Sequence, residues 1–285
     1  MMQIAVFAAI PQEYRPFQKG LGQWRRLAKR PYAIWLHRFH DKHVLLVETG
    51  MGNQLAAQAG EHLISKSPLD LLMSVGFAGS LATDLRLGQL VWSQELAVCN
   101  TLRGACPLLR YRSGQATHLA VFREIHGIRS ARFLTLEQPQ PKTTLIHHLD
   151  DLPTVIDMES EPLAALAQRH GIPFLGLRAI SDELNDEIDW DLGSILDESG
   201  KVRITKVMST VFKRPGLVAS FHGLWRNSLI AGRHLAQTLT ALLMLPERDL
   251  WALSRDLHLL PVPETTAEPL GIGESSSDDG QRPPA

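Results

Sequence analysis

The chain has little cysteine and almost no net charge. It has two cysteines in 285 residues, Cys99 and Cys106, and no C-x-x-C pair, so the sequence indicates neither a zinc site nor a disulfide framework. We therefore expect reduced thiols in an intracellular, cytoplasmic protein. The formal net charge of −1 at pH 7 provides no overall basic surface. Nucleic acid is therefore not an expected partner.

Long hydrophobic runs are also missing. No stretch approaches the roughly 18 consecutive apolar residues that a membrane-spanning helix requires, so we expect no transmembrane segment. The first ten residues are largely apolar but have no basic region before them, and Pro11 follows at once. This pattern predicts a buried strand and no signal peptide.

The common cofactor and metal motifs are absent as well. Gly50 and Gly52 follow a predicted strand, but Leu55 occupies the place of the third glycine of a dinucleotide-binding motif. There is no P-loop and no G-x-S-x-G motif. The twelve histidines are scattered and show no convincing set of three metal ligands. We expect neither a metal nor an organic cofactor.

Apolar strands alternate with helical segments along the chain. Strands are expected at 3–8, 33–39, 43–49, 69–75, 89–98, 132–136, 154–157 and 172–180. Helices are expected at 50–66, from about 160 to His170, and at 216–245. Near-continuous apolar strands between helices are typical of a sheet that is covered on both faces. The sequence therefore predicts an α/β fold with a mixed, mainly parallel central sheet flanked by helices.

The domain organisation is simple. There is no internal repeat and no linker before the C-terminal region, so we expect one domain over residues 1–246. Residues 264–285 are rich in Pro, Gly, Ser, Asp and Glu. Such a composition buries too little apolar surface to fold, which predicts a disordered tail.

Carboxylates and a glycine-rich segment follow the predicted strands. Glu13, Glu159 and Asp182 each come shortly after an apolar strand, and a predicted glycine turn occupies 76–79. Ligands of open α/β sheets bind beyond the carboxyl ends of the strands, so these groups could meet at one edge. Each alone has an ordinary structural explanation, as a helix first-turn acid or an N-cap. Together they predict a candidate site.

Four short motifs carry a family resemblance. The segments 12–13 (Q-E), 76–81 (G-F-A-G-S-L) with 87–91 (L-G-Q-L-V), 155–160 (V-I-D-M-E-S) and 178–182 (R-A-I-S-D) occur in this order. They resemble the motifs of the nucleoside phosphorylase superfamily, in particular the 5′-methylthioadenosine/S-adenosylhomocysteine nucleosidases. The resemblance covers about residues 2–182 and is weak in the final predicted helix.

The resemblance implies a function and a role for each residue. A purine nucleoside of the adenosyl type would lose its base, with Asp182 protonating N7 and Glu13 activating water. Glu159 would hold the ribose hydroxyls and Met158 would pack against the sugar. Substrate contacts are also implied for Phe77, Ala78, Gly79 and Arg178. Carboxylates suit this chemistry because base departure leaves positive charge on the sugar.

Three departures from the family pattern leave alternatives open. Phe77 stands where many relatives have a serine, and segment 134–140 has Pro139 where an aromatic base-stacking residue is expected. Arg15 after Glu13 resembles the E-x-R arrangement of the hopanoid-associated phosphorylases, whose substrate is lipid-tailed. An arginine there could bind phosphate, so both hydrolysis and phosphorolysis stay open.

Family members are commonly homo-oligomers, which we also expect here.

Two further alternatives concern function and one concerns a segment. The chain could be a non-catalytic nucleoside-binding or storage protein on the same fold, or an unrelated α/β binding module. The segment 183–216 mixes basic and apolar residues. It is either a lid or membrane-surface patch, or an amphipathic surface helix.

Overall fold

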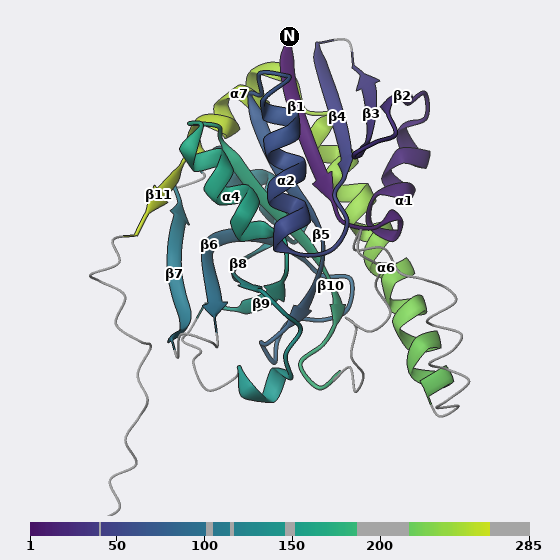
Figure 1. Cartoon of the computed structure of the whole chain (residues 1–285), viewed down its shortest axis with the longest axis vertical. Coiled ribbons are helices and arrows are strands. Elements are labelled where there is room, and N and C mark those ends of the chain that lie inside the picture. Colours follow the sequence, from purple (N-terminus) through teal and green to yellow (C-terminus); the bar gives the residue numbers. More distant parts are fainter. Residues whose placement is uncertain (40, 101–104, 115–116, 146–151, 187–216, 263–285) are drawn as a thin grey trace, which may run out of the picture.

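The computed structural model describes residues 1–39, 41–100, 105–114, 117–145, 152–186 and 217–262. These residues form one mixed sheet with helices on both of its faces (Figure 1). The strands are β1 (Met2–Ala8), β2 (Arg25–Ala28), β3 (Ala33–Arg38), β4 (Lys42–Glu48), β5 (Leu71–Ser80), β6 (Leu90–Asn100), β7 (Ala105–Ser113), β8 (Arg129–Leu136), β9 (Thr154–Asp157), β10 (Phe174–Asp182) and β11 (Leu259–Pro261).

The strand order is β11-β7-β6-β8-β9-β5-β1-β4-β3-β2, and β10 pairs with both β5 and β6. The central strands β4, β1, β5 and β10 are parallel, so their carboxyl ends lie at one edge. The strands predicted at 33–39 and 43–49 are observed as the antiparallel pair β3–β4. The strand β9 runs parallel to β8 but antiparallel to β5, where it pairs Ile156 with Gly79. The strand β9 therefore lies beside the carboxyl end of β5.

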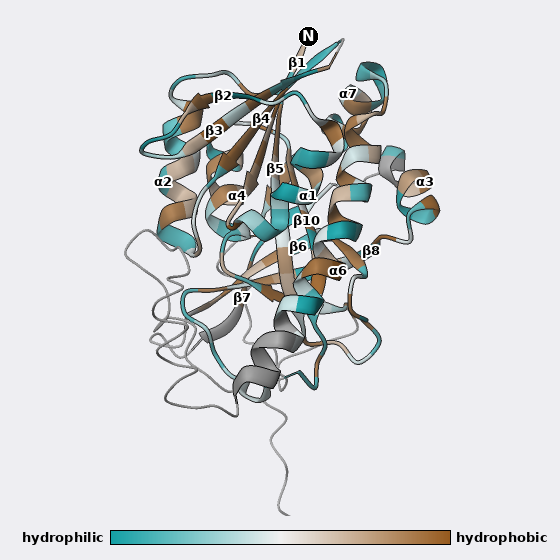
Figure 2. Ribbon diagram, turned by 90° about the vertical axis from the view of Figure 1, so that its right-hand side faces the viewer, coloured by the Kyte–Doolittle hydropathy of each residue, from teal (hydrophilic) through white to brown (hydrophobic). Residues whose placement is uncertain are grey.

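Helices cover the two faces of the sheet unequally. Figure 2 shows α2 (Asn53–Ile64) and α4 (Ser160–Arg169) on one side of the sheet. On the other side lie α1 (Pro11–Leu21), α3 (Thr117–Ile125), α6 (Leu217–Leu243) and α7 (Glu247–Asp256). A short 3-10 helix, η2 (Lys142–Thr144), follows β8. This arrangement confirms the predicted α/β fold with helices on both faces.

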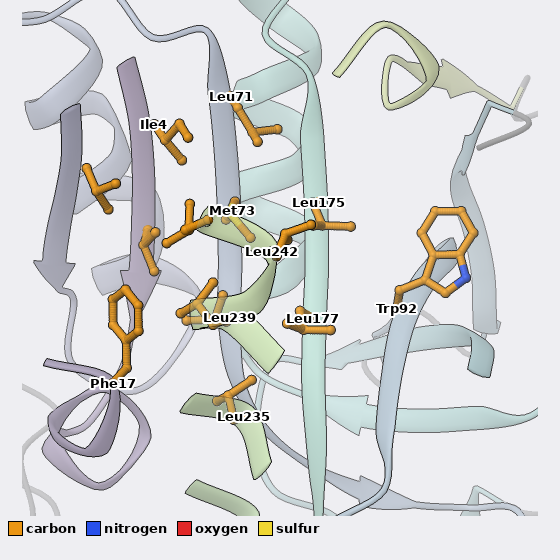
Figure 3. Close-up of a cluster of buried hydrophobic side chains, with 14 of the residues drawn as sticks. Ile4, Phe17, Leu71, Met73, Trp92, Leu175, Leu177, Leu235, Leu239 and Leu242 are labelled. Atoms are coloured by element: carbon orange, nitrogen blue, oxygen red, sulfur yellow. The ribbon is translucent and has the colours of Figure 1, made fainter. Parts of the chain in front are cut away.

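The core has a layer on each face of the sheet, because successive side chains of a strand point to opposite sides. In β1, Ile4 belongs to the layer under α1 and α6, and Phe7 to the layer under α2 and α4. Figure 3 shows Leu235, Leu239 and Leu242 of α6 pointing at the strands. These three leucines lie within the helix predicted at 216–245 and are buried.

The fold continues beyond the predicted boundary at residue 246. Pro246 ends α6, but it is also the N-cap of α7, so a second helix begins at once. Leu250 and Leu253 of α7 are buried in the core, and β11 pairs with β7. The folded unit therefore reaches at least Pro261. The predicted tail at 264–285 and residues 187–216 lie outside the described residues.

The expectation of reduced thiols is wrong. Cys99 is disulfide-bonded, and the chain's other cysteine is Cys106. The reason is the antiparallel pairing of β6 with β7, which places Asn100 opposite Ala105. Cys99 is the residue before Asn100 on β6, and Cys106 is the residue after Ala105 on β7.

Candidate active site

The carboxylate of Glu13 is held by backbone N–H groups. Its Oε2 accepts hydrogen bonds from Ala9 N at 2.8 Å and Ile10 N at 3.1 Å, where β1 passes into α1. Its Oε1 accepts one from Phe77 N at 2.9 Å, on β5. Glu13 thus satisfies amide groups at the start of α1 and also reaches the carboxyl end of the central sheet. Three fixed donors leave its carboxylate little freedom to move.

Two glycines of β5 make room for two of the carboxylates. A Cβ at Gly76 would lie 2.5 Å from Glu13 Oε1, and one at Gly79 would lie 2.6 Å from Asp182 Oδ2. We predicted a turn over 76–79, but this is wrong because β5 continues to Ser80. The glycines are needed for close approach of side chains to the strand.

Glu159 lies two residues after the end of β9 and is half-buried. Its Oε1 accepts a hydrogen bond of 2.7 Å from Gly52 N at the start of α2. Burial, followed by the negative charges of Asp157 and Glu13, raises the pKa of Glu159 from its ordinary 4.5 to about 8. The carboxyl group is therefore largely protonated at neutral pH.

The electrostatics link Glu13 to Glu159. Burial raises the pKa of Glu13, and the positive charge of Arg178 and the three backbone hydrogen bonds act against this rise. Arg178 also lowers the pKa of Glu159. The charge of Arg178 therefore acts on both Glu13 and Glu159, and both carry raised pKa values, which is common at functional sites.

Arg178 has an almost wholly buried side chain. Its Nη2 is 2.9 Å from Asp157 Oδ2 and donates hydrogen bonds to Ser74 Oγ and Ser160 Oγ, both at 2.9 Å. Its Nη1 donates to Ser74 O at 2.8 Å. Since its Nη atoms already have protein partners, the arginine acts on the site mainly through its charge. Direct contact with a substrate stays a prediction.

Asp182 ends β10 and is held on both carboxylate oxygens. Ser181 Oγ donates to its Oδ1 at 2.7 Å, and Lys142 Nζ lies 2.6 Å from its Oδ2. Both side chains of this ion pair are at most 10% exposed. The sequence motif contains the serine and the aspartate, but nothing in it indicates the lysine.

The other predicted site residues make fewer contacts with the three carboxylates. Met158 is half-buried beside Glu159, and Ala78 is buried in β5. The Phe77 side chain packs against the core layer under α6, so the residue serves the site through its backbone N–H. Arg15 is exposed, and its side chain interacts with the hydroxyl of Tyr14. A role for Arg15 in phosphate binding stays a prediction.

Two residues of the site were missed from the sequence. Asp157 was part of a recognised motif without a role; it pairs with Arg178 and also accepts a hydrogen bond of 2.8 Å from Thr135 Oγ1. A buried acid at the end of a strand was the available signal. Lys142 follows a proline in a segment with no pattern, so only the structure reveals it.

Two observations bear on metals and membranes. Across the described ranges, no group of three or more His, Cys, Asp or Glu side chains could hold a metal ion. No helix in the same part of the chain is long and apolar enough to cross a membrane.

Comparison with known proteins identifies the family of this chain. Residues 3–207 match the family model described as Phosphorylase superfamily. The 5′-methylthioadenosine/S-adenosylhomocysteine nucleosidase of Oceanobacillus iheyensis is 22% identical over 230 residues, covering 74% of this chain and 100% of the relative. The corresponding nucleosidase of Baumannia cicadellinicola is 25% identical over 201 residues, covering 64% of this chain and 86% of the relative.

A solved structure has the same fold. The S-adenosylhomocysteine nucleosidase of Streptococcus pyogenes, in complex with 5-methylthiotubericidin, superimposes with a TM-score of 0.63 at 20% identity. The match covers 86% of this chain and 98% of that one. The family model spans more than half of the 285 residues and includes every carboxylate of the site. The chain therefore belongs to the phosphorylase superfamily.

Proposed function

We propose that this protein cleaves the N-glycosidic bond of a purine nucleoside of the adenosyl type, with water as the attacking group. The observation that carries the proposal is the placement of Glu13, Glu159 and Asp182 around the end of β5. Glu13 and Asp182 each lie against a glycine of that strand. The positive charge of Arg178 acts on both Glu13 and Glu159. The nucleosidase names of the relatives point to the same reaction.

Glu13 is the group that activates water. Its pKa is raised by burial, which makes the carboxylate a stronger base, and its three backbone hydrogen bonds fix its position. As the bond between C1′ and N9 breaks, the electron pair leaves with the base and positive charge grows on the sugar. The Glu13 carboxylate stabilises that charge and takes a proton from the water that attacks C1′.

Glu159 and Asp182 hold the two halves of the substrate. A carboxyl group with a pKa of about 8 can both donate and accept hydrogen bonds near neutral pH, which suits the ribose hydroxyls. Asp182, whose Oδ2 lies 2.6 Å from Lys142 Nζ, would protonate or hydrogen-bond N7 of the departing base. Met158, next to Glu159, would pack against the sugar. We keep the homo-oligomer and the cytoplasmic location as predictions.

The test is base release from adenosine, 5′-methylthioadenosine and S-adenosylhomocysteine, with and without phosphate. We expect release without phosphate, and a fall of about 10²- to 10⁴-fold in kcat/KM for Asp182→Asn, the range typical of general acid–base catalysis. Asp41→Asn is the matched control, because Asp41 also pairs with a buried lysine, Lys42, at 2.7 Å. That variant should keep the wild-type rate.

Other outcomes would decide against the proposal in different ways. Strict dependence on phosphate would make the protein a phosphorylase and would support a phosphate-binding role for Arg15. Tight binding of a purine nucleoside without any release of base would leave the non-catalytic binding protein. Equal losses in Asp182→Asn and Asp41→Asn would remove Asp182 from the reaction.

A further inference from the structure

The edge of the sheet that ends in β2 is strongly basic (Figure 1). Residues 14–39 contain seven lysines and arginines and no aspartate or glutamate. The formal net charge of the whole chain is −1, so the remainder of the chain is net negative. One of the seven, Arg15, interacts with the hydroxyl of Tyr14. The other six are exposed and define the basic edge: Lys19, Arg25, Arg26, Lys29, Arg30 and Arg38.

The charges of the basic edge are not compensated by neighbouring acids. Within the described ranges, no carboxylate forms an ion pair with any of the six residues. Arginines elsewhere on the surface are paired: Arg129 Nη1 lies 2.7 Å from Asp84 Oδ2, and Arg169 Nη2 lies 2.8 Å from Glu61 Oε1. Unpaired like charges repel one another. The anionic groups of a partner would relieve this repulsion.

Protection of the sheet edge explains only part of this charge. The strand β2 is the last strand on its side of the sheet and pairs with β3 alone. Charged side chains on such a strand prevent pairing with another chain, and Arg25 and Arg26 can serve that purpose. Lys19 belongs to α1, however, and Lys29 and Arg30 lie in the connection from β2 to β3. These three cations lie outside the exposed strand, so they need another explanation.

The aromatic rings beside the basic edge are already covered by other side chains. The guanidinium group of Arg26 lies over the Trp35 ring, 5.3 Å from its centroid. The Trp24 ring packs against Phe17 and His37, with centroid distances of 5.5 and 5.1 Å. Proteins that bind single-stranded nucleic acid combine positive charge with aromatic rings on which the bases stack. The arrangement here therefore favours a partner that is anionic but is not read by stacking.

An apolar side chain interrupts the basic edge. Leu27 is 46% exposed and lies between Arg26 and Lys29 in the sequence. Lysine and arginine side chains reach lipid headgroups with their charged ends while their apolar stems lie along the interface. Basic residues with an apolar residue among them are typical of surfaces that lie on anionic bilayers. An exposed edge strand can also approach a flat surface along its whole length.

We propose that the basic edge binds the surface of bilayers that contain anionic phospholipids. The remainder of the chain is net negative and is repelled by the same surface, so the protein is oriented with β2 toward the lipid. Three strands, β3, β4 and β1, separate β2 from β5. The carboxylates at the end of β5 are therefore left uncovered. The inference does not depend on the reaction that the site catalyses.

The experiment measures sedimentation of the full chain with lipid vesicles. One set of vesicles contains phosphatidylcholine alone, and the other contains equal amounts of phosphatidylcholine and phosphatidylglycerol. We expect binding to the mixed vesicles and little binding to phosphatidylcholine. Binding should weaken from low to physiological ionic strength, where the Debye length falls to about 8 Å.

A triple variant tests the basic edge directly. Lys19→Gln, Lys29→Gln and Arg30→Gln are combined, because all three residues are exposed and none lies in a strand. Each lysine or arginine near an anionic bilayer contributes a factor of about five to the partition coefficient, so the variant should bind on the order of 100-fold more weakly. The matched control combines Lys66→Gln, Arg169→Gln and Arg248→Gln.

The control separates local charge from net charge. It removes the same number of positive charges from exposed positions outside the basic edge. It should stay within a few-fold of wild-type binding. Equal losses in the two triple variants would overturn the inference, because net charge alone would then explain the binding.

Three other outcomes would also overturn the inference. Wild-type protein could stay in solution with the mixed vesicles at low ionic strength. It could also bind equally to both kinds of vesicle, which would show that anionic lipid is not recognised. Finally, a single-stranded oligonucleotide could displace the protein from vesicles and lose its own binding in the basic-edge variant, which would assign the surface to nucleic acid.

Discussion

Replacing Gly76 by alanine tests how the active site is built. The added Cβ would lie 2.5 Å from Glu13 Oε1 and 2.9 Å from Glu13 Cδ. Contacts of this kind normally begin at about 3.4 Å, so the carboxylate must move by roughly 0.9 Å. A move of that size weakens or breaks the hydrogen bond that Phe77 N donates to Oε1 at 2.9 Å. The side chain that we assign to water activation is then misplaced.

The expected loss is larger in activity than in stability. A misplacement of about 1 Å near the reacting groups can reduce the rate by about 10²-fold, equivalent to about 2.7 kcal/mol of transition-state stabilisation. Overpacking typically costs about 1–3 kcal/mol of stability, which leaves much of the protein folded. The assay is the initial rate of base release from 5′-methylthioadenosine, together with a urea denaturation curve for each variant.

Gly20→Ala is the matched control. Gly20 lies in α1, the helix that carries Glu13, and a Cβ there would have no atom within 4 Å. Alanine should stabilise this helix by up to about 1 kcal/mol and leave the rate unchanged. A Gly76→Ala protein that is folded and as active as wild type would refute the placement of Glu13 against β5, and with it the assignment of Glu13 as the base.

Three further predictions follow from the buried charges. Asp157→Asn leaves Arg178 without its carboxylate partner and should lower the free energy of unfolding by about 3–5 kcal/mol in urea; a loss below about 1 kcal/mol would contradict a buried ion pair. Because Glu159 binds its proton more tightly in the folded state, the free energy of unfolding should fall as the pH rises from about 4.5 to about 8 and then level off. Glu159→Gln should make thermal melting less dependent on pH over that range, and an unchanged pH profile would show that Glu159 is not perturbed. In Asp157→Asn, the pKa of Glu159 should also fall, which would appear as a shift of the same pH profile to lower pH.

Much of the fold could be predicted because local sequence patterns correspond to single elements. The strand predicted at 154–157 coincides with β9, and the helix predicted at 216–245 corresponds to α6. The omissions have physical causes. The exposed strand β2 lacks an apolar face, and β11 is too short to show alternation. Pro246 indicated an end, although a proline can also precede the first residue of a helix, as it does at α7.

The sequence by itself determined the order of the motifs, the family resemblance and the identity of the three carboxylates. These features depend on residue types and spacing, which are read directly from the chain. It also indicated that the strands end at a common edge, although β9 proved to run antiparallel to β5.

Only the tertiary structure decided what surrounds those carboxylates. Lys142 meets Asp182 across 40 positions of sequence, and Gly52 meets Glu159 across 107. Glycines 76 and 79 are required because side chains from α1 and β10 press against β5, although a glycine pair reads locally as a turn. Contacts between distant segments leave no periodic pattern in the sequence. The positive charge beside Asp182 therefore depends on how the chain folds.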